Sequence, residues 1–107
     1  MNYLALGDSM SIDDYTGMTG GGAASQFSTL IAADEFQNLT YNGLTTANIL
    51  VSLDEVAIQP DVITLTATGN DLLQAIMWAG SDQLHDQAVI QPLHRLSEIL
   101  RHLSRYQ

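Results

Sequence analysis

The chain alternates short apolar runs with longer stretches in which apolar residues recur every three or four positions. The apolar runs predict three strands, at residues 2–6, 38–42 and 62–68, and the last, "VITLTAT", is the strongest strand signal. Helical spacing predicts four helices, at residues 24–36, 45–56, 70–79 and 91–106. The resulting order, β-α-β-α-β-α-α, is typical of an α/β domain with a parallel sheet.

The number of strands affects what we expect at the edge of this sheet. Three strands are few, because open α/β sheets of this kind usually continue, and residues 62–68 are too apolar for a bare edge. We therefore expect one domain over residues 1–107, truncated to about three strands. Either a missing C-terminal segment or a second copy of the chain, as in a homodimer, would cover the edge.

Composition and charge narrow the classes of function. Apolar residues make up 46% of the 107 residues, enough for a packed core, and cysteine is absent, which removes disulfide and thiolate chemistry. The net charge of −9 repels phosphate backbones, so we expect no nucleic-acid partner. Neither a membrane span nor a signal peptide is apparent, so a cytoplasmic location is expected, although a processed exported form would look the same. We predict no metal site from the adjacent acids Asp13 and Asp14, and no cofactor.

Polar turns follow all three predicted strands. They are Gly7-Asp8-Ser9, Asn42-Gly43 and Gly69-Asn70-Asp71. Because ligands bind beyond the carboxyl ends of parallel strands, the three turns should meet at one rim of the sheet. Ser9 supplies a hydroxyl nucleophile, Gly43 a backbone N–H without a side chain in the way, and Asn70 an amide donor. Together these groups indicate acyl transfer, in which the donors stabilise an oxyanion.

At these turns the sequence resembles a known family. The stretches "ALGDSMS", "NGLTT" and "TGND" are similar, in order and position, to blocks I, II and III of the SGNH (GDSL) hydrolases, over roughly residues 3 to 75. The resemblance implies a flavodoxin-like three-layer sandwich and a serine esterase, lipase or other acyl hydrolase acting on a small-molecule ester. It also implies that Ser9 is the nucleophile, that Gly43 and Asn70 complete the oxyanion hole, and that Asp8 holds the turn.

Each of these residues also has a purely structural interpretation. Ser9 can cap a turn or a helix, Gly43 can serve only a turn of positive φ, and Asn70 is predicted to cap the helix that follows it. These interpretations need not conflict with catalysis, since a cap residue can still present its amide to the rim. The case for chemistry therefore depends on the three turns occurring together.

A serine hydrolase also needs a general base, which the family supplies from an Asp and a His near its C-terminus. Asp82 and His85 have the D-x-x-H spacing, but they follow block III by about a dozen residues, and a polar loop is the favoured interpretation. His94 and His102 lie on the last predicted helix, where a surface or helix-end position is favoured. The true pair is thus expected to be missing from this chain.

Two other classes of function stay open. The chain could be a truncated, non-catalytic α/β module that dimerises or pairs with a missing segment. It could also be a flavodoxin-like FMN module, since "TATGND" is similar to a phosphate-binding loop, although that loop should follow the first strand and here follows the third. A fluorophosphonate probe and the colour of the purified protein separate these classes.

Overall fold

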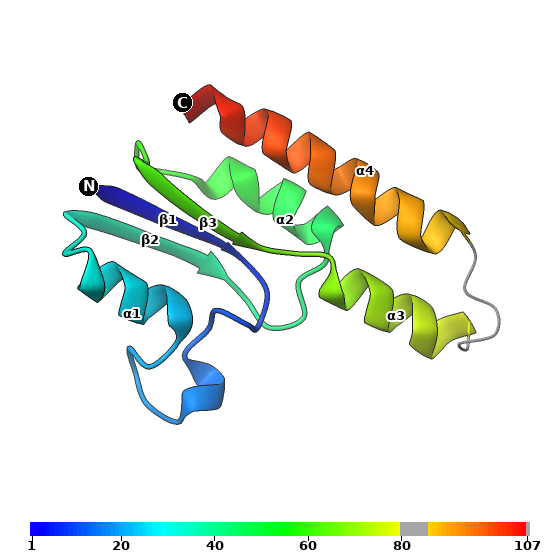
Figure 1. Cartoon of the computed structure of the whole chain (residues 1–107), viewed down its shortest axis with the longest axis horizontal. Coiled ribbons are helices and arrows are strands. Elements are labelled where there is room, and N and C mark those ends of the chain that lie inside the picture. Colours follow the sequence, from blue (N-terminus) through cyan, green and yellow to red (C-terminus); the bar gives the residue numbers. More distant parts are fainter. Residues whose placement is uncertain (80–85, 107) are drawn as a thin grey trace.

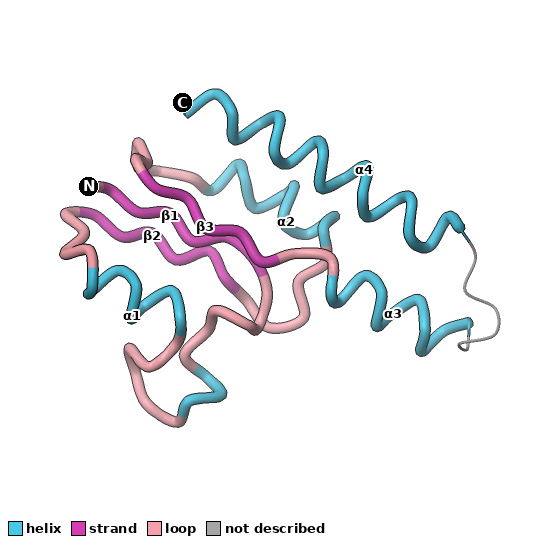
Figure 2. Tube along the Cα trace, in the orientation of Figure 1, coloured by secondary structure: helices cyan, strands magenta, loops and turns pink. Residues whose placement is uncertain are grey.

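The computed structural model describes residues 1–79 and 86–106, which form an α/β fold around a parallel sheet (Figures 1 and 2). Its strands are β1 (Asn2–Gly7), β2 (Glu35–Thr40) and β3 (Val62–Thr66). The strand order is β2-β1-β3, so the first strand in sequence is the central one, and both of its pairings are parallel. The predicted α/β class with a three-stranded parallel sheet is confirmed.

Helices cover both faces of the sheet. The helices are α1 (Ala23–Leu30), α2 (Thr46–Ser52), α3 (Gly69–Ala79) and α4 (Asp86–Leu103), and short 3₁₀ turns occupy Asp14–Thr16, Leu53–Glu55 and Ser104–Tyr106. Figure 1 shows α1 on one face and α2 with α4 on the other, while α3 continues outward from the end of β3 and packs against α4. The layers are therefore helix, sheet and helix.

The side chains of β1 divide between two cores because successive residues of a strand point to opposite faces. Leu4 and Leu6 are fully buried against α2 and α4 in the larger core, where they meet Ile99 of α4. Tyr3 and Ala5 point to the other face and form the smaller core with α1 and its Ala24. An apolar run without alternation is thus explained by burial of β1 on both faces.

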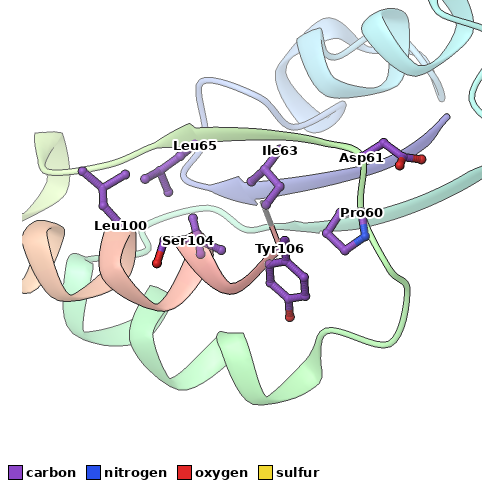
Figure 3. A pocket seen from close by; sticks show the side chains of 8 residues that line it. Pro60, Asp61, Ile63, Leu65, Leu100, Ser104 and Tyr106 are labelled. Atoms are coloured by element: carbon purple, nitrogen blue, oxygen red, sulfur yellow. The ribbon is translucent and has the colours of Figure 1, made fainter.

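The edge of the sheet at β3 is bordered by a cavity. Within the described part of the chain β3 pairs only with β1, and its residues are half-buried. A cavity of about 340 Å³ lies beside it, lined among others by Ile63 and Leu65 of β3 and by Leu100 and Tyr106 near the C-terminus (Figure 3). The strand β3 therefore combines an apolar cavity on its α4 face with an edge that no described strand covers.

The structure corrects the predicted end of the first helix. We expected a helix over residues 24–36, but α1 ends at Leu30, and Ala32 has a φ of 49°. The N–H of Ala33 donates to the Ser28 carbonyl at 3.0 Å and that of Ala32 to Thr29 at 3.1 Å, which is the Schellman pattern. Because alanine replaces the usual glycine at the left-handed position, the sequence gives no stop signal there.

Other element bounds also differ from the predictions. The second strand runs over Glu35–Thr40 rather than 38–42, and the third stops at Thr66 rather than 68. The last helix begins at Asp86 rather than 91, so Pro92 lies inside it rather than in its first turn. Its final residues, Ser104–Tyr106, form a separate 3₁₀ turn.

Candidate active site

The register of the sheet brings the three polar turns to one rim. Gly7, the last residue of β1, is paired with Thr40 at the end of β2 and with Thr66 at the end of β3. All three strands therefore end level with one another. The strand order also reverses at this point: β2 lies on one side of β1, and β3, the next strand in the sequence, lies on the other side. Such a switch point is where α/β proteins place their ligands.

The first turn is fixed by Gly7 and Asp8. Gly7 has a φ of +133°, and a Cβ at this position would lie 2.2 Å from the Thr66 carbonyl oxygen, so no other residue fits. Asp8 is buried; its N–H donates to Thr66 Oγ1 at 3.0 Å and its carboxylate accepts from the Met10 N–H at 3.1 Å. Through these two hydrogen bonds Asp8 stabilises the conformation of the first turn.

Ser9 lies at the tip of this turn, partly exposed. Among the residues that the structure describes, its hydroxyl makes no hydrogen bond, whereas the neighbouring Ser11 is buried and its hydroxyl contacts Thr66 Oγ1 at 3.4 Å. The two serines of the turn thus differ: Ser11 faces the sheet, and Ser9 is accessible from the rim. Ser9 thus lies just beyond the carboxyl end of the central strand.

The second turn, residues 42–45, contains the predicted donor Gly43. Its φ is +80°, it is exposed, and a Cβ would meet nothing within 4 Å, so glycine serves the backbone conformation rather than a close approach. The Tyr15 hydroxyl donates to Asn42 Oδ1 at 2.9 Å, which ties the segment after β1 to this turn. Thr45 then caps α2 in a capping box with Asn48, as predicted for Thr45 or Thr46.

The third turn corrects one expectation about Asn70. The helix α3 begins at Gly69, so Asn70 is its second residue and not its N-cap. Instead, Asn70 Nδ2 donates to the carbonyl oxygen of Leu44 at 2.9 Å, directly joining the third turn to the second. An amide nitrogen carries two protons, so one donor of Asn70 remains for another acceptor. Thr68, just before, has a φ of 79°, a strained value for a β-branched residue.

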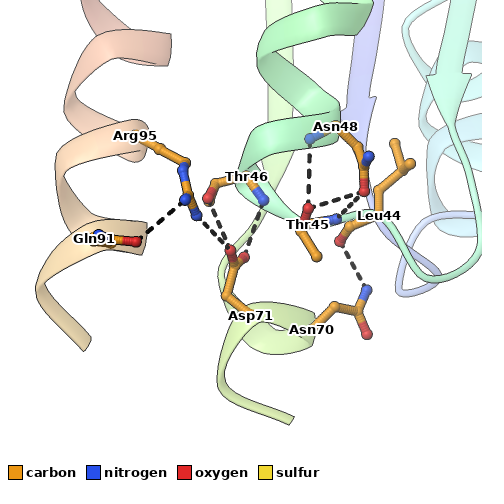
Figure 4. A network of polar contacts seen from close by, with 8 residues as sticks. All are labelled: Leu44, Thr45, Thr46, Asn48, Asn70, Asp71, Gln91 and Arg95. Carbon is orange, nitrogen blue, oxygen red and sulfur yellow. Dashed lines mark hydrogen bonds and ion pairs between the residues drawn. The ribbon is translucent and has the colours of Figure 1, made fainter. Parts of the chain in front are cut away.

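A buried carboxylate that sequence analysis missed lies next to Asn70. Asp71 accepts two hydrogen bonds from Thr46, from the backbone N–H at 3.0 Å and from the hydroxyl at 2.9 Å (Figure 4). Arg95 of α4 approaches the same carboxylate, with Nη1 at 3.7 Å from Oδ1. Only its place in "TGND" drew attention to Asp71, because its partner Thr46 is 25 residues away in the sequence.

The loop beyond Ser9 is closed by Asp13. The pKa of its carboxyl lies below the ordinary value because the N–H groups of Gly20 and Gly22 donate to it, at 2.8 and 2.7 Å, with a further contribution from the Ser25 side chain. The acid therefore organises the glycine-rich loop. Within residues 1–79 and 86–106 the structure shows no cluster of three potential metal ligands.

Among the residues that the structure describes, no histidine or carboxylate is hydrogen bonded to the Ser9 hydroxyl as a general base would be. His94 is exposed on α4, and His102 lines a cavity beside the C-terminal half of α2 with Asp54. That half of α2 points away from the rim, because the helix starts at the carboxyl end of β2 and runs back along the sheet. The predicted pair Asp82 and His85 lies outside the described residues.

The chain is similar in sequence to one lipase and in structure to another. The spore germination lipase LipC of Bacillus licheniformis is 33% identical to this chain over 86 residues, which cover 71% of the chain and 41% of LipC. The crystal structure of the lipase Lip_vut3 from a goat rumen metagenome matches 99% of this chain with a TM-score of 0.60 and 25% identity. No protein-family model matches the chain.

The chain is related to lipases. It spans 41% of the length of LipC and 57% of that of Lip_vut3, so each of these proteins has a large part with no counterpart here. In the described ranges of the chain, no helix is both long and apolar enough to cross a bilayer. The relationship is therefore to one part of each lipase.

Proposed function

We propose that this chain is a serine ester hydrolase of the SGNH type, with Ser9 as nucleophile and Gly43 and Asn70 as oxyanion donors. One observation carries the proposal: hydrogen bonds tie all three turns to one rim of the sheet. The first turn is bonded to the end of β3 through Asp8 and Thr66, and the second turn is bonded to the third through Leu44 and Asn70. The relationship to lipases supports the same reaction class.

In the proposed reaction Ser9 Oγ attacks the carbonyl carbon of a small-molecule ester. The carbonyl oxygen becomes an oxyanion, which accepts from the Gly43 N–H and from the remaining proton of Asn70 Nδ2. When the tetrahedral intermediate collapses, the ester C–O bond breaks, the alcohol leaves with the proton lost by Ser9, and an acyl-enzyme remains. Water then hydrolyses this acyl-enzyme and restores the Ser9 hydroxyl.

The base that carries the Ser9 proton lies outside the described contacts. It comes either from Asp82 and His85 or from a segment that this chain does not contain. Replacing His85 with Ala separates the two sources: loss of turnover assigns the base to His85, and unchanged turnover assigns it elsewhere. Because the proposal requires some base, rescue of an inactive chain by a lipase C-terminal segment added in trans would indicate the second source.

The nucleophile is tested with Ser9→Ala, using p-nitrophenyl acetate hydrolysis and labelling by a fluorophosphonate probe. We expect both signals to disappear while the melting curve stays that of the folded protein, because the Ser9 hydroxyl makes no described hydrogen bond. Ser97→Ala, which removes an exposed hydroxyl on α4, is the matched control and should leave both signals unchanged. Turnover or labelling that survives in Ser9→Ala would refute the proposal.

A second candidate function is a non-catalytic module that pairs along β3. The half-buried residues of β3 and the cavity beside it favour this alternative. Light scattering over a range of concentrations would show a dimer if the partner is a second copy of the chain. A dimer with an unreactive Ser9 supports the module, and a monomer with a reactive Ser9 supports the hydrolase.

A further inference from the structure

We propose that Asp71 is a positioning residue that fixes the second and third turns relative to each other, and thereby aligns Gly43 with Asn70. The inference rests on the proposed hydrolase function for its catalytic meaning, but its structural content can be tested separately. Asp71 does not face the rim itself, because both of its carboxylate oxygens are bonded to Thr46. Asp71 would act by fixing the positions of Gly43 and Asn70, which lie close to these contacts in the sequence.

Two bridges join the same pair of turns. Asn70 Nδ2 donates to the Leu44 carbonyl at 2.9 Å, and Thr46 donates twice to Asp71. Leu44 immediately follows Gly43, so both bridges start within three residues of one proposed donor, and both end at or beside the other. A single bond leaves the turns free to pivot about it, whereas two neighbouring bridges also fix their rotation. Figure 4 shows the two bridges side by side.

The bridge through Asp71 is the more rigid of the two. Thr46 is completely buried and the Asp71 side chain is only 4% exposed, so water cannot replace either hydrogen bond. The Thr46 N–H lies in the first turn of α2, where backbone donors have no acceptor within the helix. Asp71 supplies this acceptor, and hydrogen bonds to a charged acceptor are stronger than neutral ones.

Arg95 has a smaller part in the same cluster. Its guanidinium lies 3.7 Å from Asp71 and also donates to Gln91 Oε1 at 3.4 Å, and its side chain is 37% exposed. Solvent screens such a pair, so Arg95 compensates the buried charge without fixing its place. We therefore expect the geometry of the turns to depend on Thr46 and Asp71 rather than on the arginine.

A purely structural role makes a different prediction from a positioning role. If Asp71 only stabilised the fold, its loss would lower the melting temperature but leave kcat per folded molecule unchanged. If it positions the donors, kcat falls in the folded protein while KM changes little, because the oxyanion forms only in the transition state. The environments of the Gly43 N–H and the Asn70 side-chain amide would also change in the absence of substrate.

The test compares Thr46→Val, which removes the hydroxyl at nearly constant volume, with Thr46→Ser, which keeps it. Ester turnover and ¹H–¹⁵N spectra of the full chain are recorded well below the melting temperature, together with Asp71→Asn. We expect Thr46→Val and Asp71→Asn to lower kcat roughly 10- to 100-fold, the range expected for a misplaced catalytic group. The Gly43 and Asn70 amide signals should shift in both variants, and Thr46→Ser should restore signals and kcat.

The outcomes separate this inference from the proposed function. If Ser9→Ala does not affect turnover, the hydrolase proposal fails, yet shifted Gly43 and Asn70 signals in Asp71→Asn would still support the coupling of the two turns. Folded Thr46→Val and Asp71→Asn proteins with unmoved signals would overturn the inference, as would unchanged kcat in an active wild-type background. If Asp71→Asn does not fold, the two Thr46 variants decide the question in the same way.

Discussion

Replacing Asn70 with Ala separates a catalytic contribution from a structural one. The substitution removes the hydrogen bond from Nδ2 to the Leu44 carbonyl, 2.9 Å long and only partly buried. A bond of this kind contributes about 1 kcal/mol to stability. If the domain is stable by about 5 kcal/mol, about 4 kcal/mol remains and only about 0.1% of the molecules are unfolded. Unfolding therefore cannot lower the measured rate noticeably.

The catalytic effect should be far larger than this. Removing one oxyanion donor typically slows the reaction about 100- to 1,000-fold. We therefore expect kcat of Asn70→Ala for p-nitrophenyl acetate to fall by that factor, with a melting temperature lowered by only a few degrees, about 4 to 8 °C for about 1 kcal/mol in a domain of this size. The fluorophosphonate labelling rate should fall in parallel, because it depends on the same donors.

Asn2→Ala is the matched control for this prediction. Asn2 begins β1 at the opposite end of the strand, and its Nδ2 donates to the Gln59 carbonyl at 3.2 Å, so its loss should lower stability by a similar amount without touching the rim. Turnover should then stay at the wild-type level. The reasoning would be refuted if Asn70→Ala kept its turnover within about threefold of a wild type whose activity depends on Ser9, because one lost donor costs far more.

Three further substitutions test the backbone and the loop. Ala32→Gly should stabilise the protein by about 1 kcal/mol in thermal or urea unfolding, because glycine adopts the left-handed φ of 49° without strain; an unchanged or lower stability would contradict the Schellman assignment. Gly7→Ala should destabilise it by about 3 kcal/mol or more, since the added Cβ would lie 2.2 Å from the Thr66 carbonyl oxygen, and a fully stable variant would refute the close approach. Asp13→Asn should melt earlier than wild type at pH 7, because the Gly20 N–H and its neighbours favour the charged form and lower the pKa of Asp13. That stabilisation is complete above the ordinary pKa of 3.8 and is lost as the pH falls through the lower folded-state pKa, so a melting difference that does not shrink as the pH is lowered would contradict it.

The rim could be predicted from sequence because parallel sheets obey a simple rule. Strands that all run the same way end at the same edge, so a polar turn after each strand places Ser9, Gly43 and Asn70 at one rim without knowledge of any contact. The glycines Gly7 and Gly43 also indicated turns, because glycine adopts positive φ without strain. Their catalytic roles stay a prediction, which Ser9→Ala and Asn70→Ala test.

The parts that were missed depend on contacts between residues far apart in sequence. Asp71 meets Thr46 only because α3 and α2 start at the same rim, and no local pattern encodes that distance. The second strand was placed too late because most of it is exposed, with only Leu39 and Thr40 buried, so its apolar signal is short. Within that strand Phe36 is paired with Tyr3 of β1 and its ring stacks on that of Tyr3, a contact that periodicity does not reveal.

The central position of β1 has a consequence for how the protein is made. The strand β1 leaves the ribosome before either of its two neighbours in the sheet, and the later of these, β3, is not synthesised until residues 62–66. Until then Leu4 and Leu6 have no complete cover, and the sheet can form only by closing a long loop, which slows folding. A nascent chain that stalls before residue 62 thus leaves the apolar residues of β1 exposed, where they can bind chaperones or aggregate.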